Sequence, residues 1–205
     1  MIRIAGTVHR SFVFPAELPL AYAYYADIGR VLSYLPHICL ARTFGPDQLR
    51  LLYHSTELGL YHIRIFADVQ TLLEDGHVLH VRPLRGQPPI QPEAGAQSAA
   101  AQWYFASRSL FYDAGSQTRI EYKLQLRADL PTPLGLRFMP GLVVKNIARS
   151  ITNMRIREIV EGFIERSIDA FPHGLEELRN HHSLPELGTI PLGPPPTPDC
   201  PDGLF

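Results

Sequence analysis

The chain has 205 residues, of which 45% are hydrophobic and 19% charged, and its formal net charge at pH 7 is −1. This length fits one domain with a tail and is enough to bury a core without disulfides or metals. A near-neutral chain without a run of Lys or Arg lacks the basic patch typical of nucleic-acid binding, so we expect no nucleic-acid partner. No apolar stretch approaches the roughly 20 residues that span a bilayer.

The two cysteines predict no disulfide framework. Cys39 lies beside a predicted strand and Cys200 in a proline-rich tail. Unpaired cysteines favour a reducing compartment, and the N-terminus shows no basic segment followed by an apolar one, as a secretory leader would. We therefore expect a cytoplasmic protein without a transmembrane segment. Transient contact with a membrane surface is compatible with this expectation. The sequence predicts no oligomeric state.

The first 36 residues predict one strand and two short helices. Residues 2–14 alternate with period two, which is typical of a strand, and Pro15 ends it. The residues of this strand that are expected to face inward are Ile2, Ile4, Gly6, Val8, Arg10, Phe12 and Phe14. Residues 16–36 are richer in Ala and Leu and predict two helices, with a break at 27–29 and an end at Pro36.

From residue 38 to residue 130 the chain predicts one strand after another, over 38–45, 48–58, 61–73, 77–84, 100–112 and 117–130. The short connections between them, such as Asp75-Gly76, favour antiparallel neighbours. The last strand alternates apolar and polar residues throughout, so one face of the sheet is expected to meet water. Residues 85–99 are rich in Pro and Gly and predict a long loop.

Residues 141–171 predict a long helix whose apolar stripe does not stay on one face. Val143, Ile147, Ile151 and Met154 share one side, whereas beyond residue 155 that side carries carboxylates. A break near 153–156 explains this pattern, but we favour one long element with two different partners. Residues 172–205 predict a flexible or polyproline tail, so we divide the chain into a domain at 1–171 and a tail at 172–205.

This order predicts an α+β helix-grip fold, in which a curved, seven-stranded antiparallel sheet surrounds the C-terminal helix and two short helices follow the first strand. Residues 12–38, 55–70 and 148–168 resemble the START/birch-pollen-allergen-like superfamily, which includes polyketide cyclases, dehydrases and lipid-transport proteins. The resemblance implies a cavity between sheet and helix for a lipid, sterol, quinone, plant hormone or polyketide. The glycine-rich loop of the plant allergens is absent here, so their ligand contacts do not transfer.

Eight side chains are candidates for contact with a ligand. Each lies in phase with the presumed inner face: Arg10, Phe12, Tyr53, Glu57, Trp103, Phe105, Tyr122 and Met154. The large rings share their phase with Ser55, Ser107 and Ser109, and small hydroxyls among rings suit an amphiphilic pocket. Core packing also explains these rings, and it is the commoner role for any one of them. Arg10 and Glu57 either pair with each other, meet a ligand head group or reach water at a strand end.

The sequence predicts no metal, cofactor or catalytic nucleophile. The nine histidines show no zinc-ligand spacing, and the elbow of a serine hydrolase does not occur. Glu158, Glu161 and Glu165 look like a solvated helix face, with an Arg157–Glu161 pair.

We therefore expect a protein that binds or carries a hydrophobic small molecule. Two alternatives remain: a cyclase- or dehydratase-like enzyme in the same cavity, and a non-enzymatic assembly factor. A titratable pair with perturbed pKa in the cavity favours the enzyme, whereas a filled cavity with a large exposed apolar patch favours the assembly factor.

Overall fold

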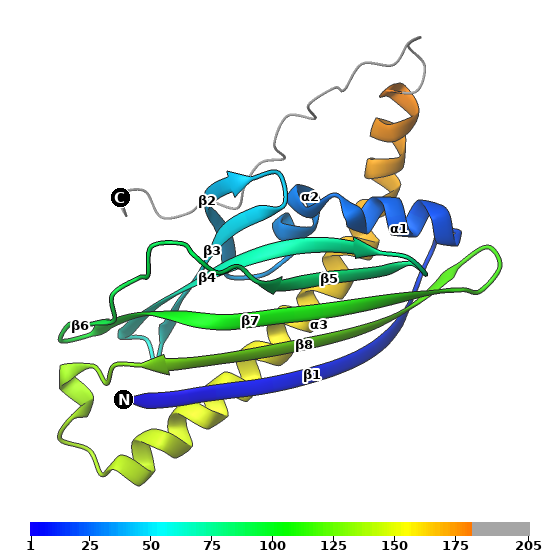
Figure 1. Cartoon of the computed structure of the whole chain (residues 1–205). Helices are drawn as coiled ribbons and strands as arrows, with labels where there is room; N and C mark the ends of the chain where they lie inside the picture. The colour runs from blue at the N-terminus through cyan, green and yellow to red at the C-terminus, as the bar shows by residue number, and fades with distance from the viewer. Residues whose placement is uncertain (182–205) are drawn as a thin grey trace.

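A computed structural model describes residues 1–181, with backbone alone from residue 173 onward. One curved sheet holds the strands, and a single long helix crosses one of its faces (Figure 1). The strands are β1 (Ile2–Phe14), β2 (Ile38–Gly45), β3 (Gln48–Glu57), β4 (Tyr61–Glu74), β5 (Val78–Pro83), β6 (Glu93–Ala94), β7 (Ser98–Asp113) and β8 (Thr118–Leu130). The predicted helix-grip fold is confirmed.

The strand order is β1-β8-β7-β5-β4-β3-β2, and the two-residue β6 is added beside β7. Every pairing is antiparallel except one, in which residues 62–66 of β4 run parallel to residues 98–102 of β7. This contact arises because the short β5 separates β4 from β7 along only part of their length. The predicted loop at 85–99 therefore contains β6 and the first residues of β7, which sequence alternation did not reveal.

Two short helices close one end of the sheet. They are α1 (Leu18–Ala26) and α2 (Ile28–Ser33), and Asp27 between them caps α2 by accepting a hydrogen bond from the backbone N–H of Arg30. Aromatic rings fill the space under α1: Phe14 lies between Tyr24, Tyr25 and Phe171, with ring centroids 4.7–5.3 Å away. This end of the molecule is therefore part of the packed hydrophobic core.

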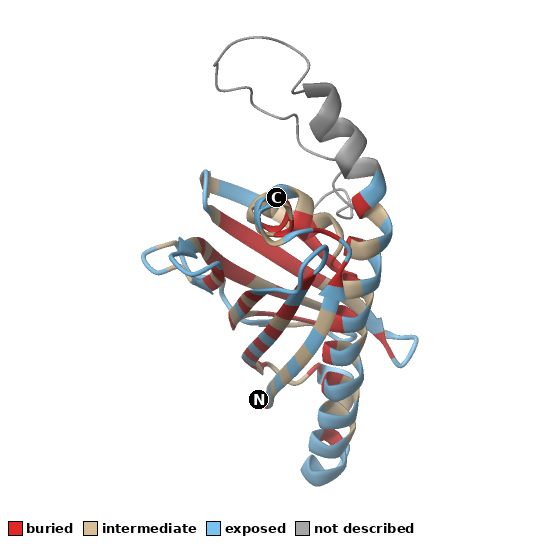
Figure 2. Cartoon of the chain, turned by 90° about the vertical axis from the view of Figure 1, so that its right-hand side faces the viewer, coloured by how far each residue is buried: buried red, intermediate tan, exposed pale blue. Residues whose placement is uncertain are grey.

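The C-terminal helix α3 runs without interruption from Gly141 to His181, past the end expected at residue 171, and contains Pro172. After a short 3₁₀ turn at Leu134–Leu136, its first turns project beyond the sheet, as Figures 1 and 2 show. Most buried positions of α3 lie three or four residues apart, and half-buried Ala148 bridges the first two: Val144, Thr152, Ile156, Ile159, Val160, Phe163, Ser167 and Phe171. One continuous stripe therefore faces the sheet, and the predicted change of face is wrong because polar Thr152 and Ser167 belong to that stripe.

Helix α3 crosses β1 at Gly6, where an added Cβ atom would overlap Ile156 Cδ1. We expect Gly6→Val to lift the helix and to lower the free energy of unfolding by about 1–3 kcal/mol, the usual cost of overpacking. Urea denaturation measures this loss. The matched change Ala5→Val adds similar bulk at an adjacent, exposed position of β1 and leaves stability nearly unchanged.

Cys39 is buried at the start of β2 and is disulfide-bonded. The expectation of two separate thiols is therefore wrong for this residue, and the argument from cysteine usage for a reducing compartment loses its basis. The other cysteine of the sequence, Cys200, lies outside the described residues.

Candidate functional site

A cavity of about 140 Å³ lies between the sheet and the N-terminal half of α3, at the end opposite α1 and α2. Its walls are almost entirely apolar. The sheet supplies Ile2, Ile4, Ile63, Ile65, Leu126 and Leu130, and the helix supplies Val144, Ile147, Ala148, Ile151, Ile156 and Ile159. This volume is close to that of a buried apolar cavity that admits a single benzene ring.

The linker between β8 and α3 closes one side of the cavity. Pro131, Pro133, Leu136 and Met139 line it from this linker, and Leu58 lines it from the β3–β4 turn. The linker is anchored to the loop beside β6, because the backbone N–H groups of Leu134 and Gly135 donate to the carbonyls of Gly95 and Ala96. Pockets for drug-sized ligands usually measure at least about 300 Å³, so this cavity suits a smaller molecule.

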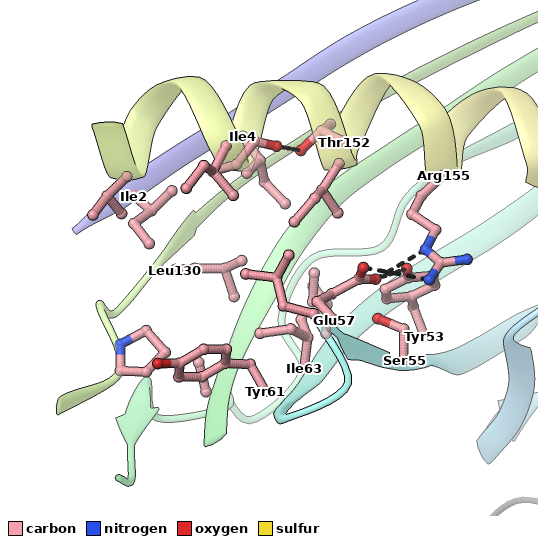
Figure 3. A pocket seen from close by; sticks show the side chains of 18 of the residues that line it. Ile2, Ile4, Tyr53, Ser55, Glu57, Tyr61, Ile63, Leu130, Thr152 and Arg155 are labelled. Carbon is pink, nitrogen blue, oxygen red and sulfur yellow. Dashed lines mark hydrogen bonds and ion pairs between the residues drawn. The ribbon is translucent and has the colours of Figure 1, made fainter. Parts of the chain in front are cut away.

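The cavity has one polar end, formed by a buried ion pair (Figure 3). Arg155 Nε donates to Glu57 Oε1 over 2.9 Å, and its Nη2 lies 3.3 Å from Glu57 Oε2. Glu57 ends β3 and is only 8% exposed. Because a buried carboxylate is costly without a partner, the guanidinium is what allows Glu57 to lie here.

The ion pair continues outward to the surface. Arg155 Nη1 donates to Glu158 Oε2 over 2.6 Å, and His37 Nε2 lies 2.9 Å from Glu158 Oε1. Hydrogen bonds to Glu57 and Glu158 raise the pKa of Arg155, whereas the contact with His37 is the main cause that lowers the pKa of Glu158. Two carboxylates therefore flank one guanidinium, so this end offers no uncompensated positive charge to an anionic ligand.

Two residues with neutral donors, Tyr53 and Trp103, line the cavity near the ion pair. The Trp103 side chain is 7% exposed, and its Nε1–H has no hydrogen-bond partner among the described residues. Tyr53 lies beside it, with ring centroids 5.7 Å apart, and its hydroxyl is 3.5 Å from Glu57 Oε1. Burial raises the pKa of Tyr53 to about 12, so its hydroxyl stays protonated at neutral pH.

The eight candidate residues fall into three groups. Tyr53, Glu57 and Trp103 line the cavity. Phe105 and Tyr122 line a separate space of about 30 Å³ deeper under α2, together with Ser107 and Ser109. That space admits no more than one or two water molecules.

Phe12, Arg10 and Met154 lie outside both spaces. Phe12 is half-buried and packs against the core from β1. The expectation that Met154 faces the sheet is not met, because its side chain is 54% exposed and Thr152 and Arg155 take the inward positions. The buried stripe runs one residue later along the helix than expected, through Val144, Ala148 and Thr152.

The two charged candidates do not pair with each other. Arg10 Nη2 lies 3.3 Å from Glu161 Oε1 at the edge of α3, where both side chains reach solvent. Glu57 instead pairs with Arg155, which the sequence analysis did not single out. Arg155 lies three residues after Thr152 and directly before Ile156, and this spacing is the signal that places it at the border of the buried stripe. The expected Arg157–Glu161 pair is replaced by the Arg10 contact.

Among residues 1–181, no group of three His, Cys, Asp or Glu side chains is arranged to hold a metal ion. Within the same range, no helix has the length and apolar character needed to cross a membrane.

No protein-family model matches the chain, and no curated protein does. Solved structures do. A Thermus thermophilus protein is 16% identical, with a TM-score of 0.45 over 80% of this chain and 99% of its own. The Zhui aromatase/cyclase of Streptomyces sp. R1128 is 12% identical, with a TM-score of 0.43 over 82% and 91%. A START superfamily protein of Mycobacterium smegmatis is 15% identical, with a TM-score of 0.41 over 78% and 97%.

With identities of 12–16% and TM-scores of 0.41–0.45, these matches extend no family, ligand or reaction to this chain.

Proposed function

We propose that the protein binds an uncharged, largely apolar small molecule that carries at least one carbonyl or hydroxyl oxygen. The apolar walls favour a hydrophobic body, because burying it releases its surface from water. The observation that supports the oxygen is the buried Nε1–H of Trp103, which has no partner among the described residues. A buried donor without an acceptor costs about 1–3 kcal/mol, and a ligand oxygen would remove that cost.

The charges at the polar end favour a neutral ligand over an acid. A ligand carboxylate near Arg155 would also approach Glu57 and Glu158, whose charges repel it. A carbonyl or hydroxyl group suffers no such repulsion and still accepts from Trp103. Tyr53 and Trp103 are the donors that we expect to contact a ligand oxygen, whereas Glu57 can only accept from a ligand hydroxyl.

Binding is favoured here over acid–base catalysis. Burial raises the pKa of Tyr53 to about 12, and it also raises the pKa of Tyr122. General acids and bases work best with a pKa near the working pH, which neither tyrosine has.

Three single-ring probes test the proposal: acetophenone, which has a carbonyl; ethylbenzene, which has no oxygen; and benzoate, which is charged at pH 7. We expect acetophenone to bind most tightly and benzoate most weakly. Trp103 is the single tryptophan of the sequence and lines the cavity, so its fluorescence reports occupancy directly alongside calorimetry.

The variant Trp103→Phe keeps a ring and removes the N–H. It should weaken acetophenone about 3- to 10-fold, the usual value of one hydrogen bond, and leave ethylbenzene nearly unchanged. Calorimetry measures both, because the variant has no tryptophan fluorescence. Tyr104→Phe, on the outward face of the same strand, is the matched control. Benzoate binding as tightly as acetophenone would refute the neutral ligand, and absence of binding by all three probes would refute the site.

A further inference from the structure

The end of the molecule beside the cavity exposes an unusual amount of apolar surface. Of the thirteen large hydrophobic side chains exposed among the described residues, seven lie on the linker, the start of α3 and the β3–β4 turn. We call them the apolar tip: Leu58, Leu60, Leu134, Phe138, Met139, Leu142 and Val143. Phe138 is 95% exposed and Leu142 72%. Clustered apolar exposure of this kind marks an interaction surface, whereas isolated exposed residues do not.

The two segments of the apolar tip adjoin the same cavity, which Leu58 and Met139 both line. The two segments also lie close together. A Cβ atom added at Gly135 in the linker would lie 3.1 Å from the hydroxyl of Tyr61, which follows the β3–β4 turn. Leu58 has a positive φ of 55°, in a turn position where Gly, Asn or Asp is usual. Leu58 is nevertheless 62% exposed, so most of its apolar surface is free to contact a partner.

The linker and the first turns of α3 carry charges of one sign. Between Asp129 and Glu158 the sequence has five basic residues and no acidic one, although the whole chain has a net charge of −1. Arg137, Lys145 and Arg149 are exposed and make no ion pair with a described residue. The acids that flank this region are already neutralised: Asp129 by Arg3 at 3.0 Å, and Glu158 by Arg155 at 2.6 Å.

Two of these basic residues border a hollow on the outer side of the linker. The hollow has a volume of about 430 Å³ and is open to solvent, and Arg137 and Lys145 line it together with Leu136 and Met139. Leu136 and Met139 also line the ligand cavity, so the linker is a thin wall between the two spaces. A phosphate group in the hollow would meet two cations and lie beside exposed apolar side chains.

We propose that the apolar tip docks the protein on the surface of an anionic lipid bilayer, with Phe138 and Leu142 entering the interface and Arg137, Lys145 and Arg149 facing lipid phosphates. Exposed apolar residues surrounded by unpaired basic ones are the combination that binds anionic interfaces. A second copy of the chain is a poor partner for this surface, because the basic residues of the two copies would oppose each other. Docking does not depend on the ligand proposed above.

Flotation of the full chain with vesicles tests docking. Phosphatidylcholine vesicles are compared with vesicles containing 30% phosphatidylglycerol, at 50 and 500 mM NaCl. We expect the protein to float with the anionic vesicles at low salt, to bind phosphatidylcholine at least tenfold more weakly, and to dissociate from the anionic vesicles at high salt, because three basic residues each contribute about fivefold.

Phe138→Asp should weaken binding to anionic vesicles about tenfold or more, the effect of removing one aromatic side chain from the interface. The combined change of Arg137, Lys145 and Arg149 to Ser should weaken it about a hundredfold. Leu73→Asp is the matched control, because Leu73 is 54% exposed on β4 outside the apolar tip. All these positions are exposed, so the fold is expected to persist, and circular dichroism checks it.

Failure to float with anionic vesicles would overturn the proposal, as would equal loss of binding in Leu73→Asp and Phe138→Asp. A concentration-dependent dimer that Phe138→Asp dissolves would also overturn it, by assigning the apolar tip to a second copy. Acetophenone binding in solution separates the two proposals, since it reports the cavity and is unaffected by Phe138→Asp.

Discussion

Replacing Arg155 with Met should lower the free energy of unfolding by about 3 kcal/mol. The change leaves the carboxylate of Glu57 buried without its cation, and an uncompensated buried charge costs about 3–5 kcal/mol. We place the expected loss at the lower limit because 22% of the Arg155 side chain is exposed, so water partly screens the pair. Urea denaturation at pH 7 measures the loss.

Two variants show whether the buried carboxylate is the cause. Glu57→Gln combined with Arg155→Met removes both charges and should regain most of the lost stability, because replacing a whole buried pair is far less costly than breaking it. Arg157→Met alters an exposed arginine of the same helix and should change stability by less than about 0.5 kcal/mol. A double variant no more stable than Arg155→Met would contradict the assigned role of the ion pair.

Filling the cavity should abolish ligand binding without unfolding the protein. Ala148 lies on the wall that α3 contributes, and Ala148→Phe places a ring in the space that a single-ring ligand needs. We expect acetophenone affinity to fall about a hundredfold, which corresponds to losing about 3 kcal/mol of apolar burial. Thermal unfolding should change little, because the new ring occupies existing space.

Met154→Phe is the matched control for this variant. Both substitutions introduce the same residue on α3, but Met154 is exposed and lies outside the cavity. Its acetophenone affinity should equal that of the unchanged protein. A loss of binding in Met154→Phe, with binding preserved in Ala148→Phe, would show that the ligand lies on the other side of the helix.

The sequence predicted the architecture because its signals are local. Alternation and turn residues placed the seven long strands within one or two residues of their ends, and Asp27 marked the break between α1 and α2. What it missed depends on distant contacts: the parallel pairing of β4 with β7, and the continuation of α3 past Pro172. Both are decided by which segments meet in space.

The site was less predictable than the fold. Strand phase correctly grouped Tyr53, Glu57 and Trp103 on one face, because alternation determines the face of the sheet on which each side chain lies. It did not separate the open cavity from the filled region around Tyr122, because phase gives no position along the sheet. The sequence did not identify Arg155, because a charged residue on a helix usually faces water. Its inward position depends on its partner Glu57, which β3 provides.

The central claim is that the cavity holds an uncharged, mostly apolar molecule. Native mass spectrometry of the purified chain, with organic extraction and identification of whatever is released, tests it directly. We predict a bound neutral compound with a carbonyl or hydroxyl group, retained by Met154→Phe and absent from Ala148→Phe. An unliganded mass for the unchanged protein that persists after incubation with acetophenone and ethylbenzene would contradict the claim, as would a bound compound retained by Ala148→Phe.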